Sequence, residues 1–144
     1  MLGEHRLRTL FIIPLVLMSL VSFPSWGLTI DDLVERNDIN YEKFTDIPFT
    51  GEVEGKMNGS FKNGKREGYW VIYHDNGQLM GKGEYKNGKQ IGFFEIYHDN
   101  GQLQSKGVIN KNDEMEGEWV GYNEDGTVWK DLTGTFKNGV KVGD

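Results

Sequence analysis

The fold is decided by the stretch GYWVIYHDNGQL, residues 68–79, which recurs as GFFEIYHDNGQL at residues 92–103. A second segment, FKNGK at residues 61–65, recurs as YKNGK at residues 85–89 with the same offset. Self-similarity at a fixed period of this size indicates one supersecondary unit stacked on copies of itself. Such a repeat disfavours an enzyme, because a catalytic site needs several different groups that converge in one pocket.

Residues 1–27 have the three-part pattern of a secretory signal peptide. Basic residues lie near the start, Leu10 to Val21 is almost wholly apolar, and Ser25 and Gly27 supply the small residues that a signal peptidase requires. We therefore expect cleavage and export, which would make the protein periplasmic or secreted in a bacterium. An uncleaved membrane anchor is the alternative, but the apolar run is shorter than the roughly 20 residues of a span, and Pro14 interrupts it.

Composition narrows the class of partner. The chain of 144 residues carries a net charge of −6, which disfavours nucleic acid and anionic membrane lipid as partners. It has no cysteine, so the sequence offers neither a disulfide framework nor a site for lipid attachment. No glycine-rich loop falls between a strand and a helix, and we therefore expect no cofactor.

Residues 28–48 precede the repeats and are predicted to cap them. A short helix is expected over 28–36, where Thr29 can cap the first turn. An irregular arm is expected over 37–48, and its apolar side chains should cover the first open edge of the sheet. Those side chains are Tyr41, Phe44 and Ile47. A repeat array needs such a cap because its first unit otherwise exposes a bare edge.

Residues 49–144 are predicted to form a chain of hairpins, so the fold class is all-β, an elongated antiparallel meander. Two turn sequences alternate, and both contain glycine after Asn or Asp, which tolerate the positive φ of primed turns. They are Asp-Asn-Gly at 75–77 and 99–101, Glu-Asp-Gly at 124–126, and Lys-Asn-Gly at 62–64, 86–88 and 137–139. Strands are expected at 51–57, 59–62, 68–73, 78–85, 92–97, 102–109, 117–122, 127–136 and 140–142.

Two irregularities interrupt the repeat. Residues 110–113, Asn-Lys-Asn-Asp, lack the turn glycine. The last unit is two residues longer than its counterpart, which preserves side-chain parity because the period of a strand is two. The sequence therefore predicts a longer strand or a bulge over 127–136.

Alternation separates the two faces of the predicted sheet. Trp70, Phe94 and Trp119 should share one face and pack over a row of glycines on the neighbouring strands, which supplies large apolar area. The glycine row contains Gly81, Gly83 and Gly107. The opposite face should carry a row of tyrosines, and it should be at least partly wet, because Lys82, Glu84, Gln104 and Lys106 also point there.

The repeated unit resembles the bacterial variant of the MORN repeat, over roughly residues 48 to 141. The matching positions are Gly68, Trp70, Asn76, Gly77, Gly92, Phe94, Asn100, Gly101 and, in a more divergent third copy, Gly117, Trp119 and Gly126. The resemblance implies a ladder of hairpins in which these residues are structural. Eukaryotic relatives are linked to membrane lipid and to protein scaffolding, and some bacterial members carry the label of antitoxin components.

The sequence motifs that could form metal or catalytic sites are better explained as structural features. His74 and His98 could form a paired metal site, but we favour hairpin corners because the third copy has Asn123 at this position. A calcium loop starting at Asp75 would need a Glu at its twelfth position, which is Lys86. The acidic residues 113–118 build no cleft for paired-carboxylate chemistry. We therefore expect no metal ligands and no catalytic residues.

The best binding candidates are Tyr73, Tyr97 and Tyr122, because tyrosine combines apolar area with a polar tip. Packing at a strand end is the alternative interpretation. The leading hypothesis is a non-enzymatic exported protein that binds another protein, as an interaction or scaffold module, through this aromatic surface. The other hypotheses are an antitoxin or immunity-type protein that neutralises a toxin, and an envelope glycan or lipid binder. Open end strands could also pair between copies of the chain.

Overall fold

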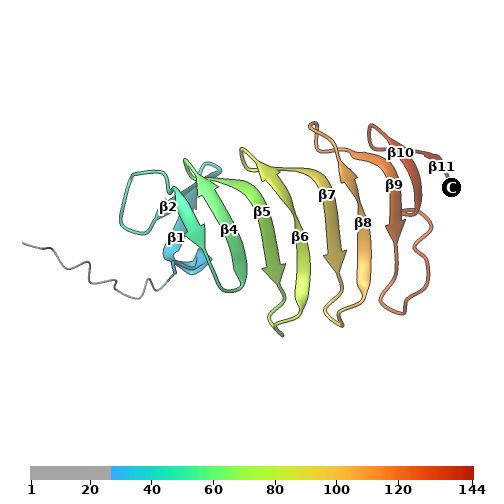
Figure 1. Ribbon diagram of the computed structural model, residues 1–144, viewed down its shortest axis with the longest axis horizontal. Coiled ribbons are helices and arrows are strands. Elements are labelled where there is room, and N and C mark those ends of the chain that lie inside the picture. Colours follow the sequence, from blue (N-terminus) through green and yellow to red (C-terminus); the bar gives the residue numbers. More distant parts are fainter. Residues whose placement is uncertain (1–26) are drawn as a thin grey trace, which may run out of the picture.

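The computed structural model describes residues 27–144, so all of the predicted signal peptide except Gly27 lies outside the described residues. Its main feature is a nine-stranded antiparallel sheet in which each strand pairs with its sequence neighbours (Figure 1). This order is the meander that the repeat predicts. In chain order the strands are β3 (Gly51–Val53), β4 (Met57–Lys62), β5 (Lys65–Tyr73), β6 (Leu79–Lys86), β7 (Lys89–Tyr97), β8 (Leu103–Ile109), β9 (Met115–Gly121), β10 (Gly134–Lys137) and β11 (Val140–Gly143).

The Lys-Asn-Gly turns have the predicted geometry. Asn63 and Gly64 have φ values of 51° and 76°, the pair of left-handed residues that a two-residue primed turn requires. The turns at 86–88 and 137–139 repeat this geometry, with φ of 50° at Asn87 and 48° at Asn138. These turns fix the register of the hairpins at one end of the sheet.

The Asp-Asn-Gly turns differ from the prediction. In the turn at 75–77 only Gly77 has a positive φ, of 82°. The His74 N–H donates to the Gln78 carbonyl over 2.8 Å and closes a longer loop, while the Asn76 side-chain oxygen accepts the Gln78 N–H at 2.9 Å. Asn76 therefore contributes through its side chain, as Asn does in an Asx turn, and not through its φ.

The turn without glycine, residues 110–113, adopts this same longer loop. The Asn110 N–H donates to the Glu114 carbonyl at 2.9 Å, and Asp113 takes the left-handed position with a φ of 65°. Asp reaches this region more readily than most L residues. The missing glycine therefore changes the turn type, and β8 and β9 still pair.

The best-packed core lies at the start of the sheet. Leu33, Phe49, Val53, Phe61 and Trp70 form one buried cluster, and the Trp70 side chain is 0% exposed. Phe61 meets Trp70 edge to face, with centroids 5.0 Å apart, a preferred geometry for aromatic pairs. A smaller buried pair, Trp119 and Phe136, lies near the other end.

The cap before the sheet differs from the prediction. The expected helix over 28–36 is present only as a three-residue 3-10 turn, Ile30–Asp32, which is followed by β1 (Leu33–Arg36) and β2 (Ile39–Glu42). Thr29 stands at the N-cap position of this turn, and its N–H and hydroxyl both donate to the Asp32 carboxylate, at 2.8 and 2.9 Å. No helix in the described residues has the length and apolarity that crossing a bilayer requires.

The arm at 37–48 was expected to cover the first edge with its own apolar side chains, and this was wrong for two of the three. Phe44 and Ile47 are exposed and Tyr41 is half-buried. Leu33 and Phe49 are buried in the core instead. Leu28 also covers the edge, since it forms a parallel bridge with Val53.

The predicted strand over 127–136 was also wrong. Only a single bridge joins Tyr122 to Val128, and β10 begins at Gly134. Between them the Leu132 N–H donates to the Trp129 carbonyl at 3.1 Å, which marks a turn. The two additional residues are therefore accommodated in a loop and not in a longer strand.

Candidate functional site: the tyrosine face

The sheet has two unlike faces, because consecutive residues of a strand point to opposite sides. The apolar face contains Trp70, Ile72, Gly81, Gly83, Phe94, Ile96, Gly107 and Trp119. The tyrosine face contains Tyr69, Val71, Tyr73, Lys82, Glu84, Phe93, Glu95, Tyr97, Lys106, Val108, Val120 and Tyr122. The β1–β2 hairpin packs on the apolar face at its first strands only, where Leu33 joins the core. The tyrosine face is therefore the broader uninterrupted surface.

A row of charges crosses the centre of the tyrosine face. The strand register places Lys82 opposite Glu95, and Glu95 opposite Lys106. Val71 and Val120 end this row, as the partners of Lys82 and Lys106. Opposite charges directly across a sheet stabilise the pairing of strands, and the Lys82–Glu95 ion pair joins β6 to β7 at the middle of the surface.

Glu95 is the centre of this row. Its carboxylate accepts hydrogen bonds from Lys82 Nζ at 2.7 Å and from the Tyr97 hydroxyl at 2.8 Å. The Lys82 bond lowers the pKa of Glu95, against the smaller raising effect of burial, and the same bond raises the pKa of Lys82. The Glu95 contact likewise raises the pKa of Tyr97. At neutral pH the row therefore holds a fixed ion pair and a neutral, oriented phenol.

Two apolar rows flank the charges. On one side Tyr69 and Phe93 are 57% and 54% exposed, and Val108 lies directly opposite Phe93. On the other side lie Tyr73 and Tyr97, each half-buried. Aromatic side chains of this kind are enriched at protein interfaces relative to the rest of the surface.

The three tyrosines predicted from the sequence occupy equivalent positions in successive units. Tyr73 and Tyr97 pair with Leu79 and Leu103 at matching register shifts, and Tyr122 forms the bridge to Val128. The Tyr97 hydroxyl is engaged by Glu95. Their role in binding remains a prediction, as does the alternative of packing at strand ends.

The repeated histidines and asparagines join one unit to the next. His74 Nε2 donates to the Tyr97 carbonyl at 2.9 Å, and His98 Nε2 donates to the Tyr122 carbonyl at 2.8 Å. The amide of Asn76 donates to the Asp99 carbonyl at 2.7 Å, and Asn100 repeats this bond in the next unit. Each imidazole thus contacts backbone at a hairpin corner. Within residues 27–144 no three His, Cys, Asp or Glu side chains come together in an arrangement able to hold a metal ion.

On the apolar face, each large aromatic ring lies over a glycine of the preceding strand. Trp70 lies over Gly59 and Trp119 over Gly107, in each case leaving no room for a Cβ. The predicted packing is confirmed for Trp119 over Gly107, but it was wrong for Trp70, which lies over Gly59 of β4 and over none of the glycines named. Phe94 covers Gly83 less completely, since a Cβ there would lie 2.9 Å from the Phe94 ring.

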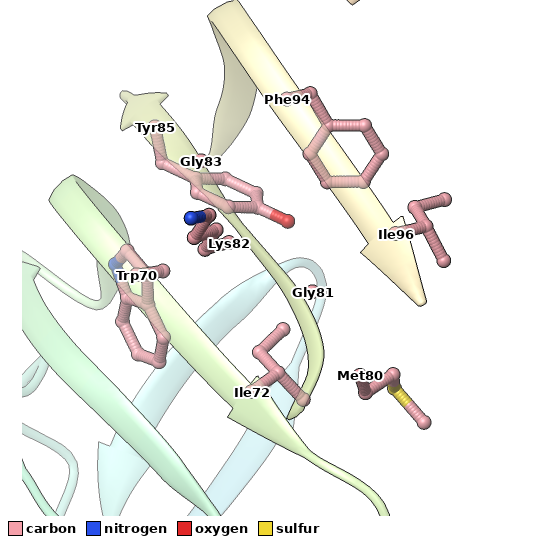
Figure 2. A pocket seen from close by; sticks show the side chains of 9 residues that line it. All are labelled: Trp70, Ile72, Met80, Gly81, Lys82, Gly83, Tyr85, Phe94 and Ile96. Carbon is pink, nitrogen blue, oxygen red and sulfur yellow. The ribbon is translucent and has the colours of Figure 1, made fainter. Parts of the chain in front are cut away.

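A hollow of about 120 Å³ remains where the smaller Phe94 ring replaces the indole of the neighbouring units (Figure 2). Its floor is the backbone of Gly81 and Gly83. Its walls are Trp70 and Ile72 on β5, Phe94 and Ile96 on β7, and Tyr85 at one end. Sequence reasoning missed this hollow and the charge row. The signal for the charge row was Lys82 and Lys106, which lie one repeat apart.

The match to a known protein family coincides with two hairpins of the sheet. Residues 66–87 and 92–110 match the family model described as the MORN repeat variant. These segments cover β5–β6 and β7–β8, which are the two hairpins that carry the charge row. Neither a curated protein nor a solved structure matches the chain. The chain therefore carries two consecutive repeats of the MORN repeat variant family, folded as successive hairpins of one antiparallel meander.

Proposed function

We propose that this protein is a non-enzymatic, exported repeat protein that binds another protein through the tyrosine face. The observation that carries the proposal is the arrangement of exposed Tyr69 and Phe93 beside the Lys82–Glu95 ion pair on one face of the sheet. Tyrosine and other aromatic anchors contribute most of the energy in protein interfaces, while charges beside them set orientation and specificity.

Rigidity supports the same proposal. The Glu95 carboxylate is held by two hydrogen bonds, and the strand ladders on both sides of β7 fix the backbone beneath it. Because a preorganised surface loses little conformational entropy on binding, its contacts translate more fully into affinity. The exposed Lys106 is free to meet an acceptor on the partner, since it has no ion pair within residues 27–144.

Site-specific photocrosslinking tests the binding proposal. A photoreactive phenylalanine derivative at position 93 should give a discrete adduct with one partner in the native cells. The matched control places the same group at Lys111, in an exposed turn away from the face. Lys106→Glu, which reverses a charge without removing a hydrogen bond, should weaken the adduct from position 93. Equal crosslinking from position 111, or an adduct indifferent to Lys106→Glu, would contradict the proposal.

The export proposal has a separate test. Expression of the full chain in a bacterium, followed by intact-mass measurement of the product, should give a chain that begins at Leu28. A product that retains residues 1–27 would count against a cleaved signal. The two tests are independent, because the tyrosine face begins well after the expected cleavage point.

A further inference from the structure

The Glu84 carboxylate, on the tyrosine face, has no cationic partner among the described residues. Glu84 is exposed on β6, and it takes part in none of the ion pairs within residues 27–144. Its neighbours on the same face of the strand are Lys82, which is bound to Glu95 instead, and Lys86, which lies beyond ion-pair distance. The Glu84 carboxylate is therefore available to a cation from outside the chain.

Exposed aromatic side chains lie on both sides of Glu84. On β5, Tyr69 is its direct partner in the strand register. On β7, a bulge at Gly92 and Phe93 interrupts the pairing opposite Glu84, and Gly92 has the left-handed φ, 70°, that is typical of such bulges. A Cβ on Gly92 would lie 3.6 Å from Glu84 Oε2. The carboxylate therefore extends across to β7, at the residue next to Phe93.

This combination of a carboxylate and two exposed rings occurs in one unit of the described sheet. One repeat before Glu84 the residue is Ser60, and one repeat after it is Val108. The third unit has an exposed carboxylate, Glu118, but its neighbours across the strands are Thr135 and Val108, and neither is aromatic. Glu118 therefore serves as a matched control for the charge without the rings.

We propose that Tyr69, Glu84 and Phe93 bind an arginine side chain of the partner protein, an inference that rests on the function proposed above. Adjacent strands lie about 4.8 Å apart, so β5 and β7 lie about 10 Å apart and their two aromatic residues bracket Glu84. A guanidinium is planar, so it stacks on aromatic rings while it donates two parallel N–H bonds to a carboxylate.

Charge and shape both favour arginine as the occupant. The chain carries a net charge of −6, which attracts a basic partner and speeds its association. Rings that face a cation add an attraction of their own. The ammonium of lysine is compact and strongly hydrated and has no plane to stack. We therefore expect an arginine, and not a lysine, at this position of the partner.

Peptide titration of the full-length protein tests the site directly. The probes are three tripeptides with blocked ends, whose central residue is arginine, lysine or citrulline, the neutral analogue of arginine. The arginine peptide at millimolar concentration should shift the amide signals of Glu84, Gly92 and Phe93. The citrulline peptide should bind about tenfold more weakly, because its hydrogen bonds lack the charge. Equal binding of citrulline would overturn the role of charge, and equal binding of lysine would overturn the assignment of arginine.

Substitutions separate this site from general attraction to an acidic surface. Glu84→Gln should remove the preference for arginine over citrulline, whereas Glu118→Gln removes the same charge from the chain and should leave the preference unchanged. Phe93→Leu and Tyr69→Leu should each weaken the arginine peptide by about two- to fivefold, as expected for an exposed cation on a ring. A preference that survives Glu84→Gln, or that is lost in Glu118→Gln, would overturn the proposal.

Crosslinking separates failure of this inference from failure of the proposed function. A photoreactive group at position 108, which is exposed beside Phe93, leaves the three proposed binding residues intact. Its adduct with the partner should weaken about tenfold in Glu84→Gln and persist in Glu118→Gln. An equally strong adduct in Glu84→Gln, or no shift with the arginine peptide, would overturn the arginine site alone. Absence of any partner adduct from positions 93 and 108 would contradict the proposed function and this inference with it.

Discussion

Replacement of Gly59 by alanine tests the packing rule that the apolar face follows. The Trp70 ring lies directly over Gly59, and an added Cβ would overlap three atoms of the indole. Trp70 is completely buried and is held edge to face by Phe61 and Tyr85, so its ring can move away from Gly59 only by giving up these contacts. The backbone at Gly59 has no positive φ, and alanine is therefore strained by contact alone.

Two opposing effects set the change in the free energy of unfolding that Gly59→Ala should cause. Overpacking a filled core costs about 1–3 kcal/mol, and the lower backbone entropy of alanine returns about 0.5–1 kcal/mol. Because a shift of Trp70 would break its aromatic contacts, we expect Gly59→Ala to lower the free energy of unfolding by about 1–2 kcal/mol. For a chain of this length that corresponds to a fall in Tm of about 3–10 °C.

Urea unfolding followed by circular dichroism measures this change, and Gly143→Ala is the matched control. A Cβ at Gly143 would lie 3.6 Å from the Thr135 side chain, an ordinary contact. The control should therefore be neutral or slightly stabilising. The reasoning would be refuted if Gly59→Ala unfolded at the same urea concentration as the native protein, or at a higher one.

Three further substitutions probe other contacts. Glu95→Gln removes the partner of Lys82 and should lower stability at pH 7 by less than about 1 kcal/mol. Since the pKa of Glu95 is lowered from 4.5 in the folded state, this difference should shrink as the pH falls below that value and vanish once the pH is below the lowered pKa of the folded state. His74→Ala removes the bond to the Tyr97 carbonyl and should cost about 0.5–1.5 kcal/mol in urea unfolding. Asp113→Gly should raise stability by about 0.5–1 kcal/mol, because glycine reaches the left-handed φ of this turn without strain.

Each of these has its own control. Glu118→Gln removes an exposed charge from the next unit without breaking an ion pair and should change little at either pH. Asn123→Ala, at the position equivalent to His74, removes only a local bond to Thr127 and should cost less than His74→Ala. Asn112→Gly, beside Asp113, should not stabilise. A gain equal to that of Asp113→Gly would show that loop flexibility and not φ was responsible.

Much of the fold could be predicted because short stretches of sequence specify the turns and the buried face of the sheet. Asn-Gly at 63–64 defines a primed turn by steric preference alone, and alternation around Trp70 defines a buried face. The longer loop at 75–77 could not be separated from the primed turn, since the same residue types serve both. There Asn76 acts through a side-chain hydrogen bond that depends on the exact chain path.

The cap and the final loop were mispredicted for a physical reason. The acidic residues after Thr29 favour a helical first turn, but Leu33 is buried in the same core cluster as Trp70, and this tertiary packing outweighs local preference. Similarly, residues 127–136 alternate well enough for a strand, yet the additional length is absorbed at the sheet's less packed end. Local patterns carry no information on how many neighbours a segment will find.

The candidate site was predicted only in part. The row of Tyr73, Tyr97 and Tyr122 follows from the period, because equivalent residues of a repeat must align. The pairing of Lys82 with Glu95 depends on register between strands, which the turns set indirectly. The hollow depends on the difference in volume between phenylalanine and tryptophan at position 94, which a pattern of apolar letters does not record.

Side-chain hydrogen bonds to the backbone connect each hairpin only to the next one. Their donors are His74, His98, Asn76 and Asn100. Nothing in the described sheet closes the array on itself, so one hairpin can be inserted or deleted without rebuilding the others. Gene segments that encode such a unit can change in copy number by unequal recombination. The tyrosine face would then lengthen by one hairpin at a time, while the spacing of its side chains stayed constant.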